Sequence, residues 1–90
     1  MIETSKYLHY DINAGPNNVI EVSFDMPWVN VLLMDEYNYR NYKRGKAYSY
    51  FGGLAESSPF NLRPPKYSNW HLVIDRGGKE LQSGVYLNVV

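Results

Sequence analysis

Seven short apolar runs, spaced about ten residues apart and separated by Gly, Pro, Ser and Asn, limit the folds open to this chain. Runs of this length suit β-strands, and no segment is long enough to form a helix that crosses between parallel strands. We therefore predict a mainly all-β chain, with residues 1–90 forming one antiparallel β-sandwich domain of about seven strands. The expected strands lie within residues 6–12, 18–25, 28–35, 46–53, 58–65, 69–78 and 83–90.

Two of these runs differ in how their apolar residues are distributed. In residues 18–25, NVIEVSFD, apolar side chains alternate with polar ones, so Ile20, Val22 and Phe24 share one face. Such alternation is typical of a strand with one buried and one solvent-facing side. Residues 28–35, WVNVLLMD, are apolar almost throughout, which predicts a central strand that is covered on both faces.

The last two runs predict a hairpin and a polar strand face. The connecting segment DRGGKELQSG, residues 75–84, has turn-forming residues at both ends and is expected to be a hairpin loop. Within the preceding strand, Trp70 and the apolar residues alternating with it should point into the core. His71 and Asp75 should then lie in a polar row that faces solvent.

Charge and cysteine content exclude several classes of protein. The chain carries nine Lys and Arg against nine Asp and Glu, so it has no net charge to support strong non-specific binding of nucleic acid. It contains no cysteine, which excludes disulfides and thiolate metal sites and suits a reducing compartment. The start of the chain lacks a signal-peptide pattern, and no apolar run is long enough to span a membrane. We expect a cytoplasmic protein that does not bind membranes.

The stretch DEYNYRNYKRG, residues 35–45, is the one place where a helix is expected, near residues 36–44. Asp35 is a suitable N-cap, and Gly45 suits the left-handed position that ends many helices. On such a helix the cations share one face and the tyrosines another. The candidate ligand-binding residues are Tyr39, Arg40, Tyr42, Lys43, Arg44 and Lys46.

Two interpretations of this basic and aromatic stretch remain open. The cations could hold a phosphate-bearing, nucleotide-like ligand while a tyrosine stacks on its base. Alternatively, Tyr39 or Tyr42 packs against the sheet, the cations are solvated, and Glu36 pairs with Arg40 one helical turn away.

Catalytic and metal sites receive little support from spacing. Ser68, His71 and Asp75 contain the residue types of a hydrolase triad, but His71 and Asp75 are about 13 Å apart along a strand. His9 and Asp11 share one strand face and could both bind a metal, but no third ligand is identifiable. We therefore expect no catalytic residues, no metal and no cofactor.

Residues 28–78 also carry a characteristic order of short segments. An apolar strand is followed by MDEYNY, YKRG, a Tyr-Phe-Gly-Gly pattern, SP, WHLVID and GG. This order resembles the bacterial family catalogued as domain of unknown function eighteen eighty-three. The resemblance implies small β-rich domains, sometimes joined to signalling domains of the Toll/interleukin-receptor type, with no assigned catalytic activity. The layout is also similar to jelly-roll sandwiches, so we expect a jelly-roll-like arrangement.

Two positions depart from the family's pattern. The family tends to have Gly and His immediately before the tryptophan, where this chain has Ser68 and Asn69 and places His71 after Trp70. No role of the family's histidine can therefore be transferred to this chain. Arg76 stands where an apolar residue is more usual.

Three functions follow as hypotheses. The first is a non-enzymatic bacterial binding module that recognises a protein partner or a small phosphate-bearing ligand in signalling or defence. The second is a structural subunit that self-associates, for example through an edge strand at residues 84–90, GVYLNVV. Binding of nucleic acid ranks third because the chain has no net charge.

Overall fold

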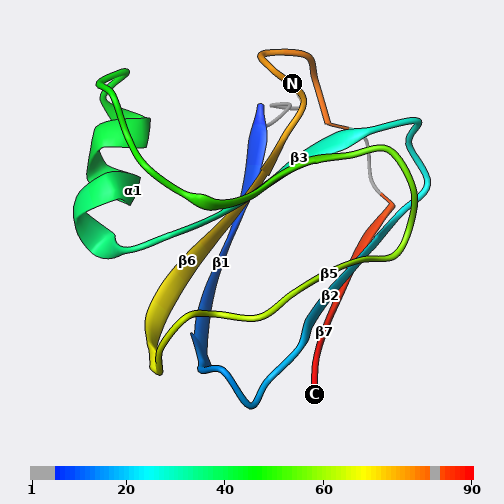
Figure 1. The fold of residues 1–90 in the computed structure, drawn as a ribbon. Coiled ribbons are helices and arrows are strands. Elements are labelled where there is room, and N and C mark those ends of the chain that lie inside the picture. Colours follow the sequence, from blue (N-terminus) through cyan, green and yellow to red (C-terminus); the bar gives the residue numbers. More distant parts are fainter. Residues whose placement is uncertain (1–5, 82–83) are drawn as a thin grey trace.

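The computed structural model describes residues 6–81 and 84–90 and consists of two antiparallel sheets packed face to face (Figure 1). In the larger sheet the strand order is β1 (Tyr7–Ala14), β6 (Ser68–Asp75), β3 (Val29–Met34) and β4 (Phe51–Ala55). In the smaller sheet it is β5 (Phe60–Leu62), β2 (Ile20–Phe24) and β7 (Val85–Val89). The predicted seven-stranded antiparallel sandwich with one short helix is confirmed.

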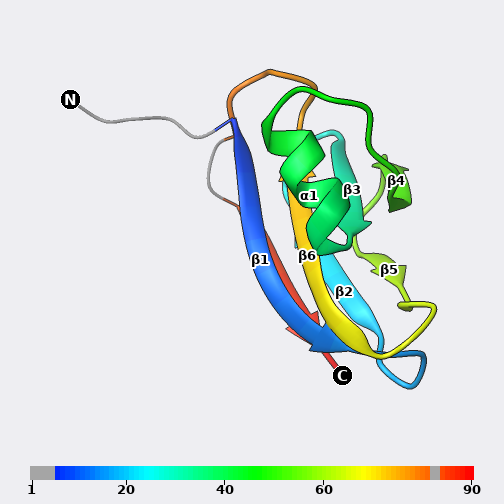
Figure 2. The ribbon, with the colours of Figure 1, turned by 90° about the vertical axis from the view of Figure 1, so that its left-hand side faces the viewer.

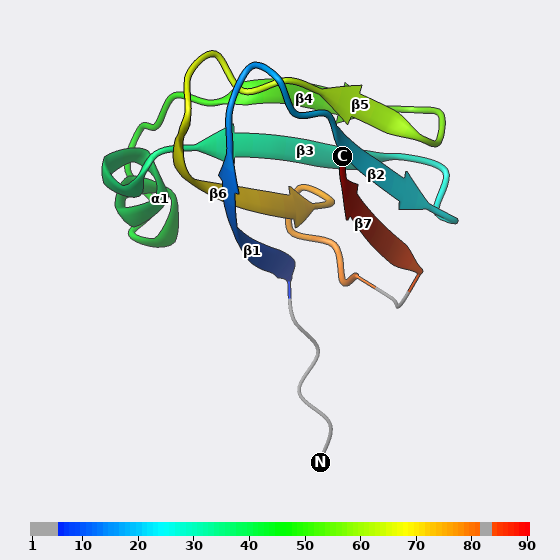
Figure 3. The ribbon, with the colours of Figure 1, turned by 90° about the horizontal axis from the view of Figure 1, so that it is seen from below.

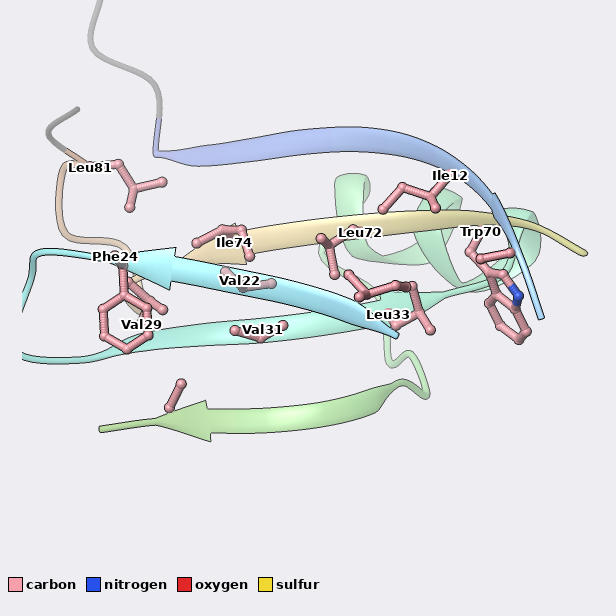
Figure 4. Packing of buried hydrophobic residues seen from close by; sticks show 13 residues of the cluster. Ile12, Val22, Phe24, Val29, Val31, Leu33, Trp70, Leu72, Ile74 and Leu81 are labelled. Atoms are coloured by element: carbon pink, nitrogen blue, oxygen red, sulfur yellow. The ribbon is translucent and has the colours of Figure 1, made fainter. Parts of the chain in front are cut away.

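The core lies between the two sheets (Figure 4). As its alternation predicts, β2 directs Ile20, Val22 and Phe24 into this core. The facing strands β3 and β6 contribute aliphatic side chains and Trp70. Burying each large aliphatic side chain stabilises the fold by about 1.5 to 3 kcal/mol. The core residues from these two strands are Val29, Val31, Leu33, Trp70, Leu72 and Ile74.

The larger sheet is also covered on its outer face, by α1 (Glu36–Lys43), which Figure 2 shows in front of β6. β3 lies between β6 and β4, and five of its six residues are buried, so the predicted central, doubly covered strand is confirmed. On the outer face, Leu32, Met34, Tyr39 and Val73 form a second, smaller apolar cluster.

The position of α1 over β6 contradicts the prediction of a solvent-facing polar row on that strand. His71 and Asp75 do not face solvent; they are only 6% and 8% exposed. Alternation along β6 correctly indicates which residues share a face, but it does not reveal that a helix from another part of the chain covers that face.

Two further predictions of local structure were wrong. Residues 75–84 do not close a hairpin, because β6 belongs to the larger sheet and β7 to the smaller one. The described part of this segment instead crosses between the sheets, and residues 82–83 lie outside the described residues. In the run 46–53, the strand begins only at Phe51, because residues 46–50 form an irregular connection from α1 to β4.

Candidate functional site

Helix α1 begins and ends as its sequence predicts. The Asp35 side chain accepts a hydrogen bond of 2.9 Å from the backbone N–H of Asn38. At the other end Gly45 has a φ of 71°, and the N–H of Lys46 donates to the carbonyl of Asn41 at 2.9 Å. The helix has eight residues. In residues 6–81 and 84–90, no helix is long and apolar enough to cross a membrane.

The two tyrosines of the predicted ligand site pack against the larger sheet. Tyr39 is 7% exposed. The Tyr42 hydroxyl donates a 2.6 Å hydrogen bond to Asp75, and the Tyr42 ring meets Tyr7 edge to face at 5.2 Å. Burial, and then the hydrogen bond to Asp75, raises the pKa of Tyr42 well above its ordinary value. Neither ring is therefore positioned as a platform on which a ligand could stack.

The cations of the predicted ligand site lie on the outer side of α1. Arg40 donates to Glu36 at 2.8 Å, which is the predicted pair one helical turn apart. The Lys43 ammonium lies over the Tyr39 ring, 4.6 Å from its centroid. These contacts match the packing interpretation of the stretch. The last two residues of the predicted set, Arg44 and Lys46, are exposed at the end of the helix.

Beneath α1, polar side chains from three elements meet in what we call the histidine cluster: His9, Asp11, Glu36, Tyr39 and His71. The register of β1 against β6 places Asp11 directly opposite His71. His71 Nδ1 lies 2.8 Å from His9 Nε2 and 3.3 Å from Asp11 Oδ1. On its other side, His71 Nε2 lies 2.8 Å from Glu36 Oε1. His71 on β6 thus contacts side chains from both β1 and α1.

Tyr39 covers the two imidazoles of the histidine cluster. Its ring is nearly parallel to that of His9, with centroids 4.2 Å apart, and to that of His71, with centroids 4.6 Å apart. The two imidazole centroids are only 5.0 Å apart, so both must lie on the same side of the Tyr39 ring. Burial lowers the pKa of His9, although the Asp11 carboxylate opposes this effect. The neutral form of His9 is therefore favoured.

A second feature, which we call the aromatic cleft, opens on the other side of α1. Its volume is about 360 Å³, and Trp70 and Phe51 meet there edge to face at 5.8 Å. Phe51 and Tyr50 are each about half exposed. Residues from the start of α1, the connection to β4 and the turn before β6 line it: Met34, Asp35, Asn38, Ser49, Tyr50, Phe51, Pro65, Lys66 and Trp70.

The residues of the rejected catalytic set have other partners. Asp75 accepts hydrogen bonds from Asn30, Tyr42 and the backbone of Gly77. His71 instead contacts the other members of the histidine cluster. The sequence places His9 and Asp11 on one strand face but identifies no third ligand. The pairing of β1 with β6 places His71 directly opposite Asp11. Glu36 comes within 2.8 Å of His71 only because α1 packs over β6.

The family model of a domain of unknown function, DUF1883, matches residues 5–90. The chain belongs to this family. The match extends the resemblance predicted for residues 28–78 across β1 and β7, so the DUF1883 domain includes the first and the last strand. Comparisons with curated proteins and with solved structures find no match.

Proposed function

We propose that this DUF1883 domain is a non-enzymatic binding module that docks a segment of a protein partner in the aromatic cleft. The single observation that supports this most is the half-exposed pair Tyr50 and Phe51 beside a cleft of about 360 Å³. Tyrosine and phenylalanine are enriched at protein interfaces, where they add large contact areas at a small cost in side-chain entropy.

The hydrogen bonds inside the aromatic cleft favour a protein segment over a small polar ligand. Small-molecule sites orient their ligand with several convergent polar groups. Here Asn38 already donates to Asp35 and accepts from the backbone of Ser49. The indole N–H of Trp70 donates to the carbonyl of Lys66. The cleft therefore offers apolar contact area more than free hydrogen-bonding groups.

The neighbouring strand extends this surface. β4 stands at the end of the strand order of the larger sheet, and it lies on the same side of the sandwich as β5 (Figures 2 and 3). On β4, Phe51 is 50% and Leu54 is 56% exposed. An extended segment can hydrogen-bond to such an outer strand while it places an apolar side chain in the cleft.

The cellular setting of the module is part of the same proposal. The family resemblance includes chains joined to Toll/interleukin-receptor domains, which favours a role in bacterial signalling or defence. The absence of cysteine favours a cytoplasmic location.

The test is a selection from a displayed library of random peptides, followed by titration of the enriched peptides with the purified domain. Phe51→Ser and Tyr50→Ser should each weaken binding at least tenfold, because each removes an aromatic contact at the cleft. Tyr86→Ser is the matched control, since Tyr86 is 72% exposed on β7 in the other sheet. No enriched peptide, or peptides that bind both cleft variants at wild-type strength, would overturn the proposal.

Self-association is a second candidate function, because β7 stands at the end of the order in the smaller sheet and exposes Tyr86. Sedimentation at rising concentration tests it, and a strict monomer at high concentration excludes it. A nucleotide that raises the melting temperature of the wild type, but not of Arg40→Glu with Arg44→Glu, would instead favour the phosphate-bearing ligand.

A further inference from the structure

Three donor atoms converge between β1 and β6, within the histidine cluster. His9 Nε2 lies 2.8 Å from His71 Nδ1, His71 Nδ1 lies 3.3 Å from Asp11 Oδ1, and Asp11 Oδ1 lies 3.9 Å from His9 Nε2. We propose that these three side chains bind a divalent transition-metal ion of the zinc type. The proposal concerns a different side of α1 from the aromatic cleft and does not depend on it.

The triangle formed by the three atoms has the size that such an ion requires. The point equidistant from its corners lies about 2.0 Å from each atom, which is the length of a zinc bond to an imidazole nitrogen or a carboxylate oxygen. In a tetrahedral zinc site the ligand atoms are about 3.3 Å apart, close to the middle of the three separations. Small rotations of His9 and His71 would therefore suffice for binding.

The hydrogen bond to Glu36 favours the tautomer of His71 that can bind a metal through Nδ1. An ionised carboxylate only accepts hydrogen bonds, so the 2.8 Å contact requires a proton on His71 Nε2. In neutral His71 the lone pair is then on Nδ1, which faces His9 and Asp11. Carboxylates hold metal-binding histidines in this way in many zinc sites. Without metal, His9 donates its Nε2 proton to His71. When the ion binds at Nε2, neutral His9 carries its proton on Nδ1 instead, a change of tautomer that takes place through solvent and leaves the Nε2 lone pair for the ion.

The surroundings of the three donors suit a single bound cation. Two carboxylates, Asp11 and Glu36, lie next to the imidazoles, and one ammonium, Lys43, lies beyond the Tyr39 ring. Tyr39 covers one side of both imidazoles with an aromatic ring. The Asp11 side chain is 63% exposed, so an ion can enter along it. Three protein ligands leave a fourth position for water or for an external ligand.

The ion would connect elements that are distant in the sequence. His9 and Asp11 belong to β1, one of the two outer strands of the larger sheet, and His71 belongs to β6. A bound ion would clamp these strands together next to α1. Because only the folded chain brings the donors together, metal binding should stabilise the fold.

The test uses the full chain without an affinity tag, treated with a chelator and then titrated with Zn²⁺ or Co²⁺. We expect one Zn²⁺ per chain and a melting temperature that rises by about 10 to 20 °C when Zn²⁺ is 100-fold above its dissociation constant. Co²⁺ should give the visible absorption of a four- or five-coordinate site. A wild-type chain that binds neither ion would overturn the proposal.

The variants avoid buried His71, because changing it could unfold the domain. Asp11→Asn and His9→Gln each remove one ligand, and each should weaken Zn²⁺ binding at least tenfold. Glu36→Gln removes the partner of His71 and should weaken binding about 10- to 100-fold. Glu56→Gln changes an exposed carboxylate elsewhere and should leave binding unchanged. Wild-type affinity in both ligand variants would contradict the assignment of the site.

Discussion

The two faces of β6 differ in polarity and in what covers them. Its inner face presents Trp70, Leu72 and Ile74 to the other sheet and is apolar throughout. Its outer face presents His71, Val73 and Asp75 to α1, and there both polar side chains are buried with hydrogen-bond partners. The inner face contributes apolar packing, whereas the outer face combines a smaller apolar cluster with buried polar groups, one of which, His71, belongs to the proposed metal site.

The largest expected effect is on the inner face. Leu72 is fully buried, so Leu72→Ala leaves a cavity and should lower the free energy of unfolding by about 2 to 5 kcal/mol. Urea denaturation measures this loss. Leu54→Ala is the matched control at a 56% exposed position and should change stability by less than about 0.5 kcal/mol. Equal effects in the two variants would contradict the assignment of the core.

On the outer face, Asp75→Ala should lower stability by about 2 to 3 kcal/mol. The carboxylate accepts from Asn30, Tyr42 and the Gly77 backbone, and the alanine variant leaves these donors without their acceptor. Chemical denaturation provides the measurement, and Asp25→Ala, at an exposed carboxylate in the bend after β2, is the comparison. A change below about 0.5 kcal/mol would show that these hydrogen bonds do not hold the outer face together.

A smaller effect is expected at the start of the helix that covers the outer face. Asp35→Ala removes the N-cap and should lower stability by about 1 kcal/mol, whereas Asp35→Asn should keep most of it. Amide hydrogen exchange of the first turn of α1 should increase in the alanine variant and not in the asparagine variant. Equal exchange in both would contradict the capping role.

The smallest effect on stability is expected from a change in pH, and it concerns the outer face, where Tyr42 is hydrogen-bonded to Asp75. The pKa of Tyr42 is raised by burial and by Asp75, so the folded domain keeps this proton above pH 10, where the unfolded chain loses it. Stability from Tyr42 is therefore fully present below pH 10 and is lost as the pH rises further. Tyr42→Phe should reduce the slope of stability against pH in this range, measured by urea denaturation between pH 9 and about pH 11. An unchanged slope would contradict the prediction.

Much of the architecture could be predicted from the sequence because short-range patterns determine it. Alternation places Ile20, Val22 and Phe24 in the core, and Asp35 and Gly45 mark the ends of α1. The sequence could not reveal which sheet the last strand joins, because residues 75–84 fit either a hairpin or a crossover.

The histidine cluster could be predicted only in part. His9 and Asp11 lie two residues apart on one strand, which the sequence shows directly. Their partners come from β6 and α1, 25 or more positions along the chain, and depend on strand register and on how the helix packs. Tyr39, Tyr42 and Lys43 lie on the helix expected near residues 36–44, whereas Lys46 lies beyond its end. The two tyrosines turn toward the sheet because their rings are the apolar part of that helix.

The most direct test of the account is nitrogen-15 NMR of the imidazole side chains, since the chain contains only two histidines. Without metal, His71 should carry its proton on Nε2, facing Glu36. On addition of one equivalent of Zn²⁺, we predict that the signals of His9 Nε2 and His71 Nδ1 shift together, while His71 Nε2 keeps its proton. Imidazole signals that do not change, or a His71 protonated on Nδ1, would contradict the assignment of a metal-binding site to the outer face.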